Sequence, residues 1–361
     1  MPREQAPTEN KNTIGRKKMK WLPLKASILG AAMVSLATPA LAQEVTLTLA
    51  HFLSPKSPPH VKFMEPWARA VEEQSSGRIK VEIFPAMTMG GKPPELYRQL
   101  RDGAADIVWT VTGYTPGVFP RSEVFELPTV HEGSAKATNL AIQDTFDMLA
   151  EDFTDVKPLL VHVHAGNALH LVNGCVESVD ELKGVKLRTP TRTGGWMIEA
   201  WGAEPVGMPV PALPQALSKG VIDGALVPFE VMPPFKLNDL TQCSVTGADD
   251  SRFGTAVFLF AMNKERYDSL PDDLKAVIDA NSGGAIAGAA GQLWDDVELP
   301  GQEMQKKTGS PISALTPEAT AAFDDLGQTV VDRWIAESAD NGVDGAALVE
   351  AARAAVAANA K

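Results

Sequence analysis

The residue best suited to bind a small molecule is Arg188, in the phrase D-E-L-K-G-V-K-L-R-T-P-T-R that covers Asp180–Arg192. A strand predicted over Val185–Leu187 delivers this arginine to a loop that Pro190 closes. A planar, permanently charged guanidinium fixed at a strand end can hold a carboxylate through two parallel hydrogen bonds. The alternative is a structural arginine that pairs with a surface acid.

The same phrase resembles the signature of the DctP-type substrate-binding proteins of TRAP (tripartite ATP-independent periplasmic) transporters. The resemblance covers essentially all of 43–361, and its most specific part is K-L-R-x-P at Lys186–Pro190. In that family the arginine binds the carboxylate of an organic acid, which implies a ligand-binding role for Arg188. The resemblance also implies an α/β, two-lobed periplasmic-binding-protein fold of the type II kind. The ligand would lie in the cleft between the lobes, and a long helix would cross between them.

The elements that must position this arginine alternate between strand and helix, which favours an α/β class. Glu44–Ala50 and Ile79–Ile83 alternate apolar and polar residues, as half-buried strands do. Between them we predict a helix that runs to about Ser75 and is kinked at Pro66.

Two segments of the chain echo each other. Pro94–Asp106 and Pro211–Asp223 share a proline, two leucines, a glycine and an aspartate at equal spacing. Each predicts a short helix, a glycine stop and a strand, at Asp106–Trp109 and Gly224–Val227. Coincidence is the alternative, because such units are common, but the pattern favours two lobes built on one plan.

The last third of the chain is predicted to be mainly helical. A helical stretch over Gln292–Lys307 should be interrupted near Pro300. Thr316 is a strong N-cap for a helix that runs to about Ser338, and Ala346–Ala358 is an alanine-rich terminal helix. The family resemblance places about 43–165 and 253–292 in lobe I, and 166–252 and 293–361 in lobe II.

Residues 1–42 have the features of a secretory signal peptide. Basic residues precede the apolar run Ala26–Ala37, which is too short to span a bilayer, and Ala40–Ala42 is a cleavage site of the A-x-A type. Export to the periplasm follows, with a retained membrane anchor as the alternative. Translation can start at Met1 or Met19.

The charge balance excludes some classes of partner. The chain has a net charge of −12, and removal of residues 1–42, which hold seven basic and two acidic residues, leaves −17. This excess of acid argues against nucleic acid and anionic membrane surfaces as partners. No insertion into the membrane is expected after signal cleavage, and an anionic ligand must be bound through local donors.

The two cysteines, Cys175 and Cys243, allow two interpretations. In an oxidising compartment they can form a disulfide. Alternatively they are buried free thiols that behave as small apolar residues. Neither lies near a His and Asp pair in the sequence, so no nucleophilic role is expected.

Candidate ligand-binding residues follow from the rule that ligands of α/β proteins lie outside the carboxyl ends of strands. Besides Arg188, they are His51, Trp109, Thr112, Tyr114, Asn167, Trp196, Phe229 and Glu230. The aromatic residues could instead belong to the core, and Glu230 could instead cap the next segment. No cofactor or metal is expected, because no cysteine or carboxylate cluster accompanies His162 and His164 on their strand.

Two positions depart from the pattern of sialic-acid and dicarboxylate receptors in this family. Val227 stands where many have an asparagine, and Ala168 stands near the place of a second arginine. Asn167 or His170 could replace the missing polar contact. The ligand predicted from these departures is a small monocarboxylate with an apolar, aromatic or branched remainder.

The sequence as a whole predicts a periplasmic receptor for a small organic-acid anion. The resemblance implies that it delivers this ligand to the small and large membrane subunits of a TRAP transporter. The alternatives are a periplasmic enzyme acting on a small carboxylate and the binding protein of an ATP-driven importer. The motifs G-x-S-x-G, H-E-x-x-H and S-x-x-K do not occur, and no catalytic residue is predicted.

Overall fold

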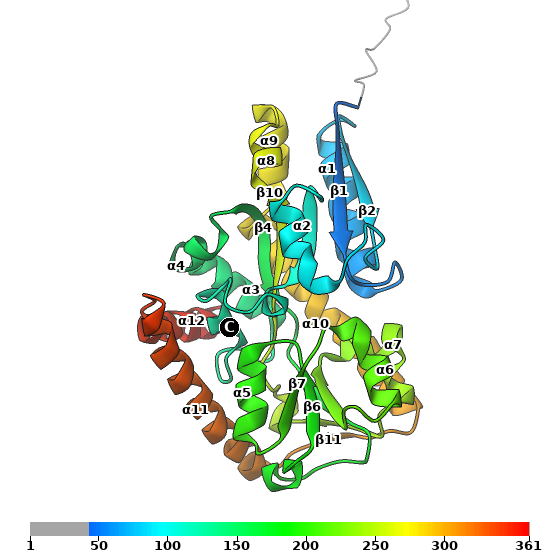
Figure 1. Cartoon of the computed structure of the whole chain (residues 1–361), viewed down its shortest axis with the longest axis vertical. Coiled ribbons are helices and arrows are strands. Elements are labelled where there is room, and N and C mark those ends of the chain that lie inside the picture. Colours follow the sequence, from blue (N-terminus) through cyan, green and yellow to red (C-terminus); the bar gives the residue numbers. More distant parts are fainter. Residues whose placement is uncertain (1–42, 361) are drawn as a thin grey trace, which may run out of the picture. The chain divides into compact units, whose positions relative to one another are not determined.

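Two β-sheets organise the chain in a computed structural model that describes residues 43–360 (Figure 1). Sheet A has the strand order β2-β1-β3-β10-β4. Its strands are β1 (Val45–His51), β2 (Ile79–Phe84), β3 (Ile107–Val111), β4 (Val156–Val163) and β10 (Val257–Asn263). Sheet B has the order β11-β9-β5-β8-β6-β7. Its strands are β5 (Ala168–Leu171), β6 (Lys186–Thr189), β7 (Glu204–Gly207), β8 (Gly224–Val227), β9 (Cys243–Thr246) and β11 (Ile312–Ala314). The predicted signal peptide lies outside the described residues.

Helices connect and cover these strands (Figure 1). They are α1 (Glu65–Gln74), α2 (Leu96–Arg101), α3 (Ala135–Asp144), α4 (Phe146–Leu149), α5 (Arg192–Ala200), α6 (Leu213–Ser218), α7 (Met232–Phe235), α8 (Lys264–Asp268), α9 (Asp272–Ala280), α10 (Gly284–Lys307), α11 (Pro317–Asp340) and α12 (Gly345–Asn359). The predicted cap of α11 is present, since the Thr316 side chain accepts a hydrogen bond from the backbone N–H of Ala319 at 3.1 Å. Within residues 43–360, no helix has the length and apolar character needed to cross a membrane.

The two sheets share one plan of strand pairing. From β2 to β4 in sheet A, successive neighbours pair parallel, parallel, antiparallel and antiparallel. From β7 to β9 in sheet B, the same series of pairings occurs. The strands β1 and β6 therefore occupy matching places, each between two parallel neighbours.

The predicted sequence echo coincides with this matching. In one copy α2 leads to β3, and in the other α6 leads to β8. The aspartate that ends each copy fastens it to the neighbouring strand: Asp106 accepts from the backbone N–H of Thr48 at 2.8 Å. Asp223 accepts from the backbone N–H of Lys186 at 3.0 Å. The same residue type thus makes the same contact in both sheets.

Arg188 lies inside a strand, not in the loop after it as the sequence predicted. Its backbone pairs with Val206 of β7 and Ala225 of β8. The strand extends past the predicted end because it has a parallel partner on each side. The arginine is therefore fixed by the sheet itself.

The long helix α10 joins elements that belong to the two sheets. It packs against α3, which lies on β4, and against the short turn of helix that follows β8. Glycines permit both close approaches: a β-carbon at Gly291 would collide with the backbone of Lys136, and one at Gly301 with the carbonyl of Phe229. The interruption predicted near Pro300 is wrong, because α10 is continuous through it. The packing of α10 against α3 and against the turn after β8 compensates for the backbone hydrogen bond that Pro300 cannot donate.

The helix predicted up to Ser75 also differs in detail. Residues Pro59–Met64 form a turn of π-helix, which changes into α1 at Glu65. The change in geometry therefore precedes Pro66, which sits in the first turn of α1 where a proline is tolerated.

The division into lobes stays a prediction. All strands of sheet A fall in the ranges assigned to lobe I, and all strands of sheet B fall in those assigned to lobe II. However, α12 packs against α3 although it was assigned with lobe II.

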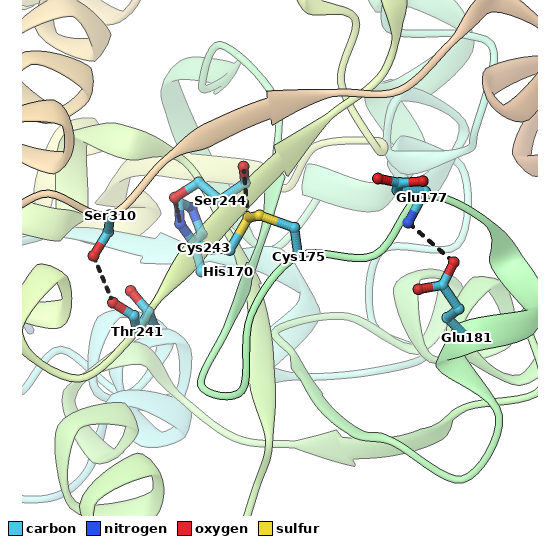
Figure 2. The surroundings of a disulfide bond; sticks show 8 residues. All are labelled: His170, Cys175, Glu177, Glu181, Thr241, Cys243, Ser244 and Ser310. Atoms are coloured by element: carbon cyan, nitrogen blue, oxygen red, sulfur yellow. Dashed lines mark hydrogen bonds between the residues drawn. A yellow bond between two sulfur atoms is a disulfide. The ribbon is translucent and has the colours of Figure 1, made fainter.

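Cys175 and Cys243, whose state the sequence left open, form a disulfide (Figure 2). Their Cα atoms are 5.2 Å apart, and the bond ties the loop after β5 to β9. The two residues are 68 positions apart, so the bond closes a loop that contains β6, β7 and β8.

Removal of this cross-link by the paired changes Cys175→Ser and Cys243→Ala should lower the free energy of unfolding by about 2–4 kcal/mol, because a disulfide across a long loop restricts the unfolded chain. Urea unfolding followed by circular dichroism measures the difference. Reductant should destabilise the wild-type protein to a similar extent and leave the variant unchanged. Equal stability of the wild type with and without reductant would contradict the prediction.

Candidate functional site

A pocket lies where strand ends of sheet A meet strand ends of sheet B. About 400 Å³ of space there is free of protein atoms, part of it open to solvent. Its lining residues are Phe52, Leu53, Trp109, Val111, Tyr114, His164, Asn167, Arg188, Pro190, Val210, Val227, Pro228, Glu230, Val231, Ala256 and Phe258. The lining is thus mainly apolar, with a few polar groups that can orient a ligand.

Arg188 is 2% exposed and is held by backbone carbonyls. Its Nε donates to the carbonyl of Met208 at 2.9 Å, and its Nη1 donates to the carbonyl of Leu226 at 3.2 Å. Burial lowers the pKa of Arg188, whereas the hydroxyl of Tyr114 beside it favours the charged form. An arginine nevertheless stays charged at neutral pH.

No carboxylate within residues 43–360 lies at ion-pair distance from this guanidinium. A buried charge without a counter-charge is costly, and carbonyl dipoles compensate it only in part. The site is therefore suited to an anion that enters the pocket and supplies the missing charge.

Aromatic side chains form the opposite wall. The rings of Phe52 and Trp109 are stacked with centroids 5.2 Å apart, and Trp109 is stacked on Phe258 at 4.7 Å. Tyr114 meets Phe52 edge-on at 5.5 Å, and its hydroxyl accepts a hydrogen bond from the backbone N–H of Val210 at 3.0 Å. These contacts fix flat apolar surfaces next to the cation, which is an arrangement that fits an aromatic acid.

Glu230 faces the pocket as a buried carboxyl group. Burial, and then the nearby Glu298, raise the pKa of Glu230 to about 8. Of these two carboxyl groups, Glu298 carries the negative charge. It forms an ion pair with Arg252 at 3.0 Å and accepts hydrogen bonds from the backbone N–H groups of Phe229 and Glu230. Glu230 is therefore neutral at pH 7 and can donate a hydrogen bond.

The pocket brings together five of the nine predicted ligand-binding residues: Trp109, Tyr114, Asn167, Arg188 and Glu230. The other four do not line it: His51, Thr112, Trp196 and Phe229. The role of all nine in ligand binding stays a prediction.

His51 and Thr112 are engaged with neighbouring backbone and side chains. Nε2 of His51 lies 2.8 Å from Nδ1 of His60. Burial, and then His60, lower the pKa of His51 to about 3. The hydroxyl of Thr112 donates to the carbonyl of Val257 at 3.1 Å, which turns it towards β10.

Trp196 and Phe229 also face other parts of the chain. The Trp196 ring contacts the guanidinium groups of Arg192 and Arg333, which lie 4.8 and 4.1 Å from its centroid. The buried ring of Phe229 packs edge-on against His170 at 5.0 Å. The sequence around Trp196 and Phe229 does not show whether each ring lines the pocket or belongs to the core.

Phe258 is a pocket residue that sequence analysis did not name. It lies on β10, which pairs with β3 on one side and with the edge strand β4 on the other. All residues of β10 are buried, so its sequence contains no alternation that distinguishes the pocket face. Phe258 lies on Trp109 because β10 pairs with β3, and this pairing joins segments that are far apart in the sequence.

The histidines considered as metal ligands make internal contacts. Nε2 of His162 accepts from the indole N–H of Trp109 at 2.9 Å, and Nδ1 of His164 accepts from the backbone N–H of Gly166 at 3.0 Å. Burial lowers the pKa of His162 to about 3 and that of His164 well below its usual value. In the part of the chain that the structure describes, no three His, Cys, Asp or Glu residues are grouped as metal ligands.

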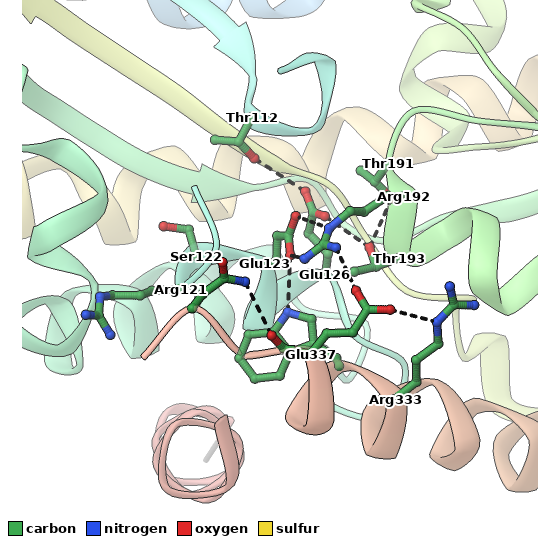
Figure 3. A network of polar contacts seen from close by, with 12 residues as sticks. Thr112, Arg121, Ser122, Glu123, Glu126, Thr191, Arg192, Thr193, Arg333 and Glu337 are labelled. Carbon is green, nitrogen blue, oxygen red and sulfur yellow. Dashed lines mark hydrogen bonds and ion pairs between the residues drawn. The ribbon is translucent and has the colours of Figure 1, made fainter. Parts of the chain in front are cut away.

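Arg192, four residues after Arg188, differs from it because carboxylates neutralise its charge (Figure 3). It forms ion pairs with Glu123 at 2.6 Å and with Glu337 at 3.0 Å. Glu123 also accepts from the indole N–H of Trp334 at 3.2 Å. This network connects the start of α5 to α11 and to the segment before Leu127, so Arg192 is structural whereas Arg188 has a free charge.

A second buried carboxyl group, Glu126, lies beside this network (Figure 3). It accepts from the backbone N–H of Val257 at 3.2 Å and from the hydroxyl of Thr193 at 3.1 Å. Burial, and then the charge of Glu123, raise the pKa of Glu126 to about 8. The folded protein therefore retains this proton at neutral pH.

Raised carboxyl pKa values predict that the ligand-free protein loses stability between pH 6.5 and 8. An unfolded chain has released these protons near pH 4.5, whereas the folded chain releases them near pH 8, so stability falls as pH rises in this window. Each carboxyl should contribute at most about 1.4 kcal/mol per pH unit. The buried histidines act in the opposite direction just above pH 6.5, because the unfolded chain is still releasing their protons there; the carboxyl contribution is therefore the difference between the wild type and the glutamine variants.

Urea unfolding at pH 6.5 and 8.0 measures this loss, and either Glu126→Gln or Glu230→Gln should reduce it. The sum of the two effects should appear in the double variant, because the two carboxyls lie in separate networks. A pH dependence that both substitutions leave unchanged would refute the assignment of the protons.

Comparison with known proteins extends these observations. The model of the bacterial extracellular solute-binding protein family 7, DctP, matches residues 49–338. A solved TRAP solute-binding protein of an unidentified marine microbe is 46% identical, with a TM-score of 0.86, and the match covers 88% of this chain and all of the other. That protein is specific for aromatic acid ligands and contains meta-hydroxyphenylacetate.

Two further relatives span most of both chains. A TRAP solute-binding protein of Rhodoferax ferrireducens, with copurified benzoate, is 38% identical over 87% of this chain and 98% of its own, with a TM-score of 0.85. The C4-dicarboxylate-binding periplasmic protein DctP of Rhodobacter capsulatus is 26% identical over 83% of this chain and 90% of its own. The two-lobed α/β fold that the sequence predicted is thereby confirmed. The chain belongs to the bacterial extracellular solute-binding protein family 7 (DctP), a family of solute receptors and not of enzymes.

Proposed function

We propose that this chain is the periplasmic receptor of a TRAP transporter and that its ligand is a small aromatic monocarboxylate. Arg188 holds the carboxylate, and the small and large membrane subunits of the permease receive the ligand. The observation that carries the proposal is the buried guanidinium of Arg188, which has no carboxylate partner within residues 43–360.

The chemistry of binding follows from the two walls of the pocket. A carboxylate that enters replaces its water shell with charge-assisted hydrogen bonds from Arg188, in a site where little water remains to screen the charges. The ring attached to it lies against Trp109, Phe52 and Phe258, whose rings are already fixed by stacking. The aromatic acids bound by the marine protein and by the Rhodoferax protein support this class of ligand.

One carboxylate is all that the pocket can neutralise. Arg188 is the one arginine or lysine among the lining residues. Arg252, which is not among the lining residues, is paired with Glu298 and Asp250. This arrangement supports a monocarboxylate and disfavours a C4-dicarboxylate, in spite of the name of the family.

Ligand contacts from both sheets can couple binding to closure. Arg188 and Val227 come from sheet B, whereas Trp109 and Phe258 come from sheet A. A ligand that touches both groups favours the arrangement in which they are close together. The membrane subunits can thus distinguish the loaded receptor from the empty one.

The change Arg188→Met should reduce affinity for benzoate by more than about a hundredfold. Loss of one partner of a buried ion pair costs about 3–5 kcal/mol, and 1.4 kcal/mol corresponds to a factor of ten. Isothermal titration calorimetry measures the affinity, and circular dichroism checks that the variant is folded. The matched control is Arg78→Met, since Arg78 pairs with Glu44 and Asp273 before the start of β2 and should not affect binding. Retained affinity in Arg188→Met would overturn the proposal.

Succinate should bind at least about a hundredfold more weakly than benzoate. Its second carboxylate would be desolvated in a pocket with no second cation, and it offers no ring to the aromatic wall. Competition calorimetry with benzoate measures the ratio. Succinate binding as tight as that of benzoate would contradict the monocarboxylate assignment.

A further inference from the structure

We infer that Glu230 and Asn167 together recognise a hydroxyl group on the ring of the ligand, so that the preferred ligands are hydroxylated aromatic monocarboxylates. This inference rests on the proposed function, which places the carboxylate of the same ligand at Arg188. It adds a second polar contact and a specificity that a carboxylate anchor alone does not provide.

Two buried oxygen atoms in the pocket lack hydrogen-bond partners. Oε2 of Glu230 and Oδ1 of Asn167 are both buried, and neither has a partner within residues 43–360. Both residues line the pocket and are 4% exposed. Buried polar atoms in folded proteins are nearly always paired, because an unpaired atom retains its full cost of desolvation. A ligand group in the pocket is the natural partner for both.

Asn167 offers an acceptor. Its backbone is fixed to the neighbouring loop, where it donates to the carbonyl of Gly254 at 2.8 Å and accepts from the N–H of Phe253 at 2.9 Å. Its side-chain Nδ2 donates to the carbonyl of Phe253 at 3.4 Å. Since a carbonyl can only accept, the amide nitrogen must face Phe253, and the oxygen is the atom left free.

Glu230 offers a donor. The adjacent Glu298 takes the ion pair with Arg252 and both backbone N–H groups of this turn, and it therefore keeps the negative charge. The indole N–H of Trp294 favours a charge on the side chain of Glu230, but burial and the nearby Glu298 outweigh it and hold the carboxyl in its protonated form. A protonated carboxyl group donates one hydrogen bond through its O–H and accepts through its other oxygen.

A phenolic hydroxyl matches this pair. It donates one hydrogen bond and accepts another, so it can donate to Asn167 and accept from Glu230. A carboxylate only accepts and would leave Asn167 unpaired. An unsubstituted ring has only a C–H group at this position and would leave both Asn167 and Glu230 unpaired.

The strand order places the pair at a suitable distance from Arg188. Strand β8 lies between β5 and β6. Ala168 at the start of β5 pairs with Val227 at the end of β8, so Asn167 lies beside the turn that carries Glu230. Arg188 on β6 is on the other side of β8, and strands separated by one neighbour lie roughly 10 Å apart. A benzene ring with a carboxylate on one carbon and a hydroxyl on the meta or para carbon spans this separation once a hydrogen bond is added at each side.

The first test compares three ligands on the wild-type mature protein by calorimetry at pH 7. We expect 3-hydroxybenzoate to bind about tenfold or more tightly than benzoate, since it satisfies two buried polar atoms. For 2-hydroxybenzoate we expect an affinity within about twofold of benzoate, because its hydroxyl lies next to the carboxylate and is too far from Glu230. Equal affinities of benzoate and 3-hydroxybenzoate would overturn the inference while the proposed function stands. Failure of both to bind would overturn the proposed function as well.

The second test assigns the preference to Glu230. In Glu230→Leu the ratio of the benzoate and 3-hydroxybenzoate dissociation constants should fall to within about twofold of unity, because the donor is lost. In Glu230→Gln the amide N–H still donates, so a preference for 3-hydroxybenzoate should remain. The ratio is the readout, since a general loss of binding or partial unfolding affects both ligands. A ratio in Glu230→Leu equal to that of the wild type would refute the role of Glu230.

Discussion

The structure depends most on a positive charge that the protein buries without neutralising it. Arg188 is held by two backbone carbonyls, and no carboxylate of residues 43–360 approaches its guanidinium. Arg192, in the same phrase of sequence, has two carboxylate partners and joins three segments. Because an unpaired buried charge opposes folding, its presence supports the proposal that a ligand supplies the counter-charge. The remaining features of the pocket then determine which anion fits.

The two sheets supply complementary halves of that pocket from one plan. The pairing Leu187 with Gly224 in sheet B corresponds to Leu49 with Ile107 in sheet A. The place of Arg188 is therefore taken in sheet A by Ala50, the residue after Leu49. Sheet B thus provides the cation and sheet A provides aromatic surfaces at the matching strand ends. For the proposed aromatic acid, this means that contacts from both sheets are needed and that affinity depends on how the two halves meet.

Local patterns in the sequence predicted most of the scaffold, and they singled out Arg188, which lines the pocket and whose role in ligand binding stays a prediction. The alternation in β1 and β2, the cap of α11 and the repeated helix-glycine-strand unit depend on neighbouring residues, and the structure confirms them. The continuity of α10 through Pro300 depends on packing against distant segments, which no local pattern around Pro300 indicates. Phe258 was missed for the same reason, since a strand buried on both faces carries no alternation. Thr112 and Trp196 were plausible from their positions after strands or near Arg188, but their side chains turn to other partners.

The central claim is that the charge of the ligand, and not only its shape, is bound by Arg188. Benzamide tests this directly, because it has the ring and nearly the shape of benzoate but no charge. Calorimetric titration of the wild-type protein with both compounds should show benzoate binding at least about a hundredfold more tightly, in line with the cost of an unpaired buried charge. Equal affinities for benzoate and benzamide would contradict the account.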